Sequence, residues 1–193
     1  MWYLKPNENI IDIWFKDIFT FSELDLINKL GSELNPEKAT IRKKGLEMVV
    51  DYNTRITDIS WLKPNDKTEW IYQKLTELIL VVNERCYKYD LTYLEDLQFT
   101  VYNEGHFCNK HIDSASNINL HSPRKLSFTL QLSDPKEYEG GDVILLTSNE
   151  PRKIKKERGI ITFFPSNTLH EVTTVTKGIR KSLVGWVHGP NWK

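Results

Sequence analysis

Apolar residues recur at helical spacing in two stretches of the first half of the chain. The first stretch predicts a helix over residues 22–34, because Ser22 followed by Asp25 resembles the start of a helix. Its apolar side comprises Leu24, Ile27, Leu30 and Leu34. The second stretch predicts a longer helix over residues 66–89. Its apolar side comprises Trp70, Leu75, Leu78, Ile79, Val82 and Cys86.

Beyond residue 95 the pattern changes to short segments of alternating polarity, separated by turn-forming glycines. The predicted strands are residues 98–102, 126–132, 142–146, 160–164, 171–175 and 182–187, with further β-prone pieces at 10–15 and within 45–61. Strands at this spacing favour an antiparallel sandwich or barrel. We therefore expect an α+β fold with a C-terminal jelly roll, the double-stranded β-helix, and N-terminal helices packed on the outside.

Composition narrows the class of protein. The 193 residues are 39% hydrophobic and 27% charged, which suits a single domain in which residues 1–95 support a core of residues 96–190. The 26 basic residues equal the 26 acidic ones, so a nucleic-acid partner is disfavoured. Two cysteines are too few for a disulfide scaffold, and neither a secretory signal nor a membrane-spanning run is recognised. We expect a cytoplasmic protein without a membrane partner.

Two histidines and an aspartate form the candidate chemistry. His111 and Asp113 make a His-x-Asp pair at the end of a predicted strand, where residues i and i+2 point to one face, and His170 lies on a later strand. Two imidazoles and one carboxylate are the set that holds non-haem Fe(II) while leaving coordination positions open. Arg180 offers a guanidinium fork for the distal carboxylate of a dicarboxylic acid at the metal, and Tyr102 offers a phenol for the same acid.

Five ordered blocks carry a family resemblance. They are YNEGHFCNKHID (residues 102–113), RKLSFTLQL (124–132), YEGGD (138–142), FPSNTLHEV (164–172) and GIRKSLVGW (178–186). In this order they resemble the Fe(II)/2-oxoglutarate dioxygenases of the prolyl 4-hydroxylase-like branch, and most of all the PKHD-type hydroxylases of bacteria and phages. The resemblance covers roughly residues 97–188.

The resemblance implies a set of site residues. His111, Asp113 and His170 would be the iron ligands, and Arg180 would bind the C5 carboxylate of 2-oxoglutarate. Tyr102 would face this cosubstrate. The remaining residues expected near it are Gln131, which stands where some relatives have a tyrosine, Ser182 and Trp186, the last chiefly as a packing residue.

The resemblance also implies an activity. Fe(II) would be the cofactor, with 2-oxoglutarate and O2 as cosubstrates, ascorbate as a candidate accessory, and succinate and CO2 as products. A prolyl residue in a peptide or protein would be hydroxylated. The polar loop at 114–123 and the segment at 41–50 would form the walls that select this substrate.

Three alternatives remain open. A free amino acid or another small metabolite could replace the peptide as substrate. A nucleobase oxygenase uses the same metal and cosubstrate, although the chain lacks net positive charge and a basic, aromatic-rich groove. A non-catalytic jelly roll could instead hold Zn²⁺ with these three residues, but closed zinc sites prefer four ligands and have no need of Arg180.

Overall fold

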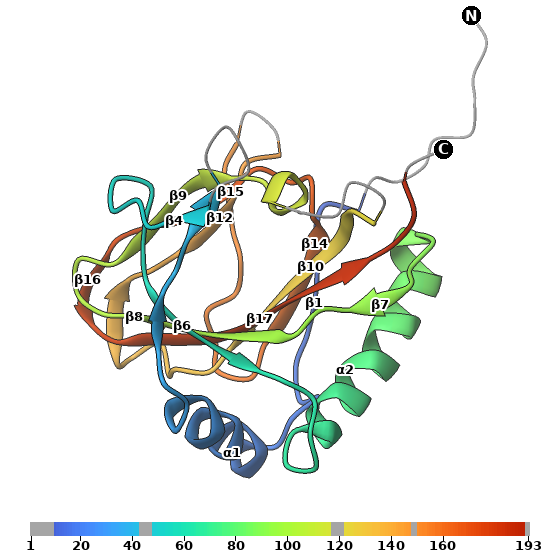
Figure 1. Ribbon diagram of the computed structural model, residues 1–193, viewed down its shortest axis with the longest axis horizontal. Helices are drawn as coiled ribbons and strands as arrows, with labels where there is room; N and C mark the ends of the chain where they lie inside the picture. Colours follow the sequence, from blue (N-terminus) through green and yellow to red (C-terminus); the bar gives the residue numbers. More distant parts are fainter. Residues whose placement is uncertain (1–9, 43–47, 117–121, 148–149, 192–193) are drawn as a thin grey trace, which may run out of the picture.

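The computed structural model describes residues 10–42, 48–116, 122–147 and 150–191 (Figure 1). Two α-helices precede the main run of strands: α1 (Phe21–Ser32) and α2 (Glu69–Val82), which continues into a π-helical turn, η1 (Asn83–Tyr87). A 3-10 turn, η2 (Asp113–Ser116), follows one of the strands.

The strands are β1 (Ile13–Phe15), β2 (Glu37–Lys38), β3 (Ile41–Arg42), β4 (Met48–Val49), β5 (Arg55–Ile56), β6 (Asp58–Leu62), β7 (Tyr93–Leu94), β8 (Leu97–Tyr102), β9 (Phe107–His111), β10 (Arg124–Gln131), β11 (Tyr138–Gly140), β12 (Val143–Leu145), β13 (Arg152–Lys153), β14 (Ile161–Pro165), β15 (His170–Val172), β16 (Val175–Gly178) and β17 (Arg180–His188).

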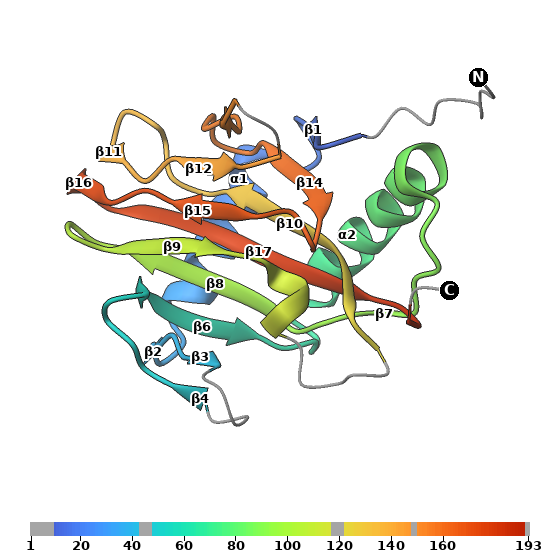
Figure 2. The ribbon, with the colours of Figure 1, turned by 90° about the horizontal axis from the view of Figure 1, so that it is seen from above.

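Two antiparallel sheets form the body of the molecule. The larger has the order β1-β14-β10-β17-β8-β6-β2, with β7 also pairing with β17, and the smaller has the order β13-β12-β15-β9-β5. Figure 2 shows β10, β17, β8 and β6 side by side in the larger sheet. Two short pairs, β11-β16 and β3-β4, complete the described strands. This arrangement confirms the predicted α+β class with a jelly-roll core.

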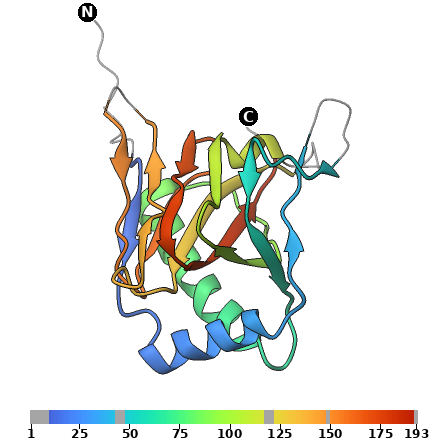
Figure 3. The same cartoon turned by 90° about the vertical axis from the view of Figure 1, so that its left-hand side faces the viewer.

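Both helices cover the outer face of the larger sheet (Figures 1 and 3). The apolar positions of β10, Leu126, Phe128 and Leu130, belong to one buried cluster with Ile27 of α1 and Leu75 of α2. Burying these side chains is the main stabilising contribution that holds the helices on the sheet. The helices therefore pack on the outside of the jelly roll, as the sequence predicts.

The helix boundaries differ from the sequence prediction. The cap of α1 is Thr20, whose side chain accepts from the backbone N–H of Glu23 while the Glu23 carboxylate accepts from Thr20, so the Ser22–Asp25 pair is not the cap. The helix ends at Ser32, and Leu34 is exposed. In the described residues, no helix is long and apolar enough to cross a bilayer.

The strands of the first half belong to both main sheets. The chain crosses from the smaller sheet to the larger one at Thr57, because β5 pairs with β9 while β6 pairs with β8.

The predicted strand over 171–175 is two strands, β15 and β16, which pair with different partners. Of the β-prone piece at 45–61, residues 43–47 lie outside the described ranges.

Gly185 leaves room for the buried ring of Phe128 on the neighbouring strand. It pairs directly with Phe128, and a Cβ atom at Gly185 would lie 2.3 Å from Phe128 Cζ and 3.0 Å from Leu97 Cδ2. Gly185→Ala should therefore lower the free energy of unfolding by about 1–3 kcal/mol, measured by urea denaturation, because the buried ring must move. Thr176→Ala, on an exposed strand position, is the control and should change it by less than about 0.5 kcal/mol. Equal midpoints for both variants would contradict this packing.

Candidate metal centre

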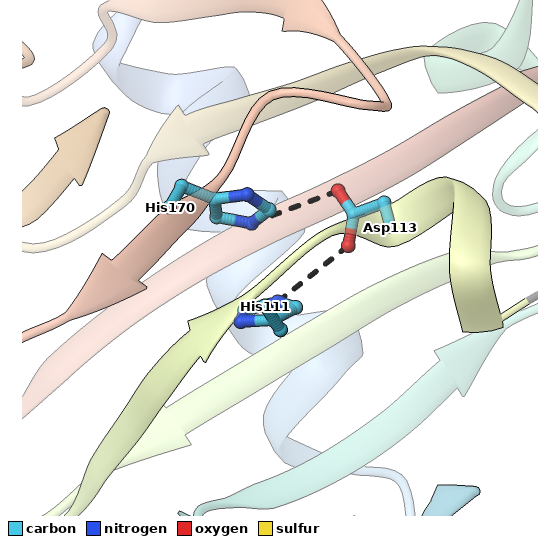
Figure 4. Close-up of side chains that lie close together, drawn as sticks. All are labelled: His111, Asp113 and His170. Atoms are coloured by element: carbon cyan, nitrogen blue, oxygen red, sulfur yellow. Dashed lines mark ion pairs between the residues drawn. The ribbon is translucent and has the colours of Figure 1, made fainter. Parts of the chain in front are cut away.

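Three structural elements bring His111, Asp113 and His170 together (Figure 4). His111 is the last residue of β9 and pairs directly with His170, the first residue of β15. Asp113 does not lie on the strand, as the i, i+2 argument assumed, but opens the 3-10 turn η2. The backbone N–H of Ser114 donates to the Ser166 carbonyl at 2.9 Å and fixes this turn. The three side chains converge because the chain turns, not because it continues as a strand.

Their geometry suits a metal ion. The candidate ligand atoms lie within 4.8 Å of one another, with Nε2 of His111 3.6 Å from Asp113 Oδ1 and Nε2 of His170 3.7 Å from Oδ2. The Nδ1 atoms bond to backbone carbonyls, at 2.8 Å for His111 and 2.9 Å for His170. These bonds place a proton on each Nδ1 and direct each Nε2 toward a metal. Two imidazoles and a carboxylate are the ligand set of non-haem Fe(II) sites with open positions.

The electrostatics of the triad centre on the Asp113 carboxylate. Burial raises the pKa of Asp113, but the two histidines and the Arg124 charge outweigh it and hold the pKa well below its ordinary value. Burial also lowers the pKa of His170. For His111, burial lowers the pKa, but the hydrogen bond to Asp113 and the neighbouring Cys108 outweigh it and raise the pKa to about 10. Without a metal, the centre thus holds an ionised Asp113, a neutral His170 and a protonated His111 at neutral pH, and a metal ion would displace the proton on Nε2 of His111.

Two serines orient the carboxylate. The Ser127 hydroxyl donates to Asp113 Oδ2 at 2.7 Å, and the Ser166 hydroxyl lies 2.8 Å from that of Ser127. Both serines are fully buried. The sequence analysis did not assign either residue to the site. The available signal was the alternation in β10, where Ser127 stands between Leu126 and Phe128 and so must face away from the helices.

A cavity of about 560 Å³ extends from the triad and is lined by residues of both sheets. It receives His111 and His170 from the smaller sheet and Arg180 from the larger one. Other lining residues are Arg55, Trp61, Gln98, Thr100, Tyr102, Arg124, Thr129, Ser182, Val184 and Trp186.

Arg180 is a buried cation with neutral partners. It is 2% exposed, its Nη2 donates to Gln131 Oε1 at 3.1 Å, and its guanidinium lies 5.4 Å from the Tyr102 ring centroid. Among the described residues, no carboxylate forms an ion pair with it. Gly141 leaves room for the arginine, since a Cβ atom there would lie 2.9 Å from Arg180 Cδ. This end of the cavity is therefore suited to a carboxylate ligand.

The remaining predicted residues surround the same cavity. Tyr102 pairs in register with Arg180 and is buried, and this burial raises the pKa of its hydroxyl. The Ser182 hydroxyl lies 2.6 Å from that of Thr100. Trp186 lies on the cavity wall beneath the Arg124 guanidinium, at 3.8 Å from the ring centroid, and belongs to neither buried apolar cluster. Trp186 is thus a buried residue of the cavity wall.

The first half of the chain supplies cavity residues that the sequence analysis missed. Arg55 donates from Nη2 to Gln98 Oε1 at 2.9 Å, and its buried Nε has no partner. Trp61 lies 6.4 Å from Trp186, ring to ring. No local signal marks these residues, because their position depends on the pairing of β5 and β6 with strands that follow about 35 to 53 residues later. In the predicted substrate walls, residues 43–47 and 117–121 lie outside the described ranges.

Comparisons with known proteins agree with this geometry. A family model described as "2OG-Fe(II) oxygenase superfamily" matches residues 97–188, which include the triad and Arg180. A PKHD-type hydroxylase of Prochlorococcus marinus is 45% identical over 91 residues, 47% of this chain and 40% of the relative. One of Synechococcus sp. (strain JA-2-3B'a(2-13)) is 31% identical over 121 residues, 60% of this chain and 54% of the relative. The chain thus spans about half the length of these curated relatives.

Solved structures share the fold at low sequence identity. A Pseudomonas putida prolyl-4-hydroxylase superposes with a TM-score of 0.70 at 19% identity, covering 93% of each chain. A prolyl hydroxylase from Trichoplax adhaerens, in complex with a hypoxia inducible factor peptide fragment, gives a TM-score of 0.71 at 18% identity and covers 91% of this chain and 82% of that one. The jelly-roll arrangement is therefore shared with both.

The serine contact to Asp113 should affect metal binding. Ser127→Ala should weaken the affinity for Mn(II) or Co(II) by about 10–100-fold, because a ligand that loses its orienting hydrogen bond must be ordered by the metal itself. Isothermal titration under anaerobic conditions measures this affinity. Ser127→Thr keeps the hydroxyl and should bind within a few-fold of the parent protein. Parent-like affinity in Ser127→Ala would mean that the hydroxyl does not orient the ligand.

Proposed function

Because residues 97–188 match the model of the 2OG-Fe(II) oxygenase superfamily, we propose that this protein is an Fe(II)- and 2-oxoglutarate-dependent dioxygenase that hydroxylates a prolyl residue in a peptide or protein. The observation that carries the proposal is the pairing of two sites in one cavity. A triad suited to a divalent cation and a buried guanidinium without a counter-ion among the described residues line the same 560 Å³ space.

His111, Asp113 and His170 would hold the iron. Bound Fe(II), together with O2 and 2-oxoglutarate, supplies the oxidising power for hydroxylation of an unactivated C–H bond, with succinate and CO2 as the other products. The protein's own contribution is to keep Asp113 ionised and fixed by Ser127 and to direct both Nε2 atoms toward the metal by holding each Nδ1 on a backbone carbonyl. A set of three protein ligands leaves room for the cosubstrate and O2.

Arg180 would bind the distal carboxylate of 2-oxoglutarate. A buried cation without an anion is unfavourable, and a dianion entering this end of the cavity would relieve that cost. Gln131 accepts a hydrogen bond from Nη2 of Arg180, which orients the guanidinium toward the cavity. The Tyr102 ring lies beside the same guanidinium. Gln131 would thus help to bind 2-oxoglutarate by positioning Arg180 rather than by touching the cosubstrate.

The cavity also offers hydrogen-bond donors besides those of Arg180. The buried Nε of Arg55 and Nε1 of Trp186 have no partner, and both residues line the cavity. Peptide carbonyls are acceptors, so a peptide backbone would satisfy these donors. The Arg124 charge is already neutralised by Glu95, through bonds of 2.7 and 2.8 Å. The Trichoplax adhaerens neighbour, whose structure holds a peptide fragment, adds support to this choice.

A free amino acid is the second candidate substrate, and the Arg55 side chain favours it. No carboxylate of the described residues pairs with this guanidinium. Its N–H groups would therefore donate to the α-carboxylate of a small substrate.

Arg180→Ala should weaken 2-oxoglutarate binding by at least about 100-fold, because the cosubstrate carboxylate would then be buried without its cation. The visible charge-transfer band of the anaerobic Fe(II) protein, titrated with 2-oxoglutarate, measures this, and succinate formed on admission of O2 reports turnover. Arg85→Ala removes an exposed arginine and serves as control. A parent protein that shows neither band nor succinate would refute the proposed activity, and an unchanged titration in Arg180→Ala would refute the role of Arg180.

Peptides should be hydroxylated in preference to free proline. We expect terminally blocked proline-containing peptides to gain 16 Da, as detected by mass spectrometry, and Arg55→Gln to raise their KM about tenfold while leaving 2-oxoglutarate affinity unchanged, because one charged hydrogen bond is lost. Hydroxylation of free proline or another free amino acid, with blocked peptides untouched, would favour the small-molecule substrate.

A further inference from the structure

The inner face of the larger sheet is organised in rows that lead from the metal centre to Arg180. Directly paired residues of antiparallel strands share a face, so each register pair defines one row. Ser127 pairs with Trp186 in the row at the metal, and Gln131 pairs with Ser182 in the row next to Arg180. The row between them contains Thr129, which pairs with Val184 on one side and Thr162 on the other.

Thr129 has a buried hydroxyl without a partner. The residue is 5% exposed, lines the cavity, and its Oγ1 makes no hydrogen bond within the described part of the chain. The hydroxyls in the neighbouring rows are satisfied: Ser127 by Asp113, and Ser182 by Thr100. An unpaired polar group in the interior is unfavourable and is seldom retained without a function.

A ligand that joins the two ends of this cavity must pass the row of Thr129. The triad marks one end and the Arg180 guanidinium marks the other, and Thr129 lies two residues from Ser127 and two from Gln131 along β10. A 2-oxoacid presents only acceptor oxygens, and a threonine hydroxyl is free to donate.

We propose that the Thr129 hydroxyl donates a hydrogen bond to the 2-oxoacid cosubstrate and so helps to select and hold it; this rests on the proposed function. Among the fully buried hydroxyls that line this cavity in the described residues, only that of Thr129 has no partner. Thr129 is thus a third binding contact, between the metal and Arg180.

Thr162 provides a matched control on the adjacent strand. It stands directly opposite Thr129, is fully buried, and its hydroxyl also has no partner, but it does not line the cavity. Thr129→Val and Thr162→Val remove the same atom from neighbouring positions of one row. A general effect of deleting a buried hydroxyl should appear in both variants, whereas a ligand contact should appear only in Thr129→Val.

The experiment is anaerobic calorimetric titration of the Mn(II)-loaded protein with 2-oxoglutarate. We expect Thr129→Val to weaken binding about tenfold or more, since a hydrogen bond to a charged acceptor is lost, and Thr129→Ser, which keeps the hydroxyl, to stay within about threefold of the parent. Thr162→Val should bind like the parent. The ligand-free Thr129→Val protein should melt no lower than the parent, because the deleted hydroxyl was unpaired.

The outcomes separate this inference from the proposed function. If the Mn(II)-loaded parent does not bind 2-oxoglutarate, the proposed function itself fails. If the parent binds and Thr129→Val binds equally well, or Thr162→Val weakens binding to the same extent, the role of Thr129 is overturned while the dioxygenase proposal stands. Selective loss of affinity in Thr129→Val, with unchanged melting temperature, supports the hydrogen bond.

Discussion

The strict alternation of side chains across the larger sheet is the constraint on which the site depends. On β10, Leu126, Phe128 and Leu130 face the helices, while Ser127, Thr129 and Gln131 face the other way and are equally buried. A shift of one residue in the register would exchange the two sets, placing hydroxyls under the helices and leucines in the cavity. The same burial that holds α1 and α2 on the sheet therefore fixes where the polar groups stand, and the site inherits its geometry from the core.

Two opposite charges lie in this interior without neutralising each other. Asp113 is stabilised by two imidazoles and by Ser127, whereas Arg180 has neutral hydrogen-bond partners at the far end of the cavity. Two separated buried charges lower the free energy of unfolding relative to a direct ion pair or to apolar side chains at the same positions. A divalent cation would pair with the Asp113 carboxylate at one end, and a dicarboxylic acid would pair with the Arg180 guanidinium at the other. The ligand-free protein is thus prepared for two ligands at once, and each should stabilise the fold by mass action.

The cavity walls have separate origins in the chain. The triad, Thr129 and Arg180 all fall within residues 97–188, the part that matches the superfamily. Arg55 and Trp61 come from outside that range and reach the cavity because the chain crosses between the two sheets at Thr57. The proposed metal and cosubstrate sites therefore lie in the part that matches the superfamily model. The first half adds one further donor to the cavity, the buried Nε of Arg55, which has no partner in the described part of the chain.

The sequence by itself determined the two helices, the change to β-strands near residue 95, and the identity of His111, Asp113, His170 and Arg180 as candidates, because periodicity and motif spacing are local properties of the chain. Tertiary structure decided the rest. Asp113 reaches the triad from a turn rather than a strand, and Ser127 is held by Ser166, 39 residues away. Arg55 meets Gln98 across 43 residues. Such contacts depend on which strands pair and in which register, and this is set by burial of the whole sheet rather than by any segment's own pattern.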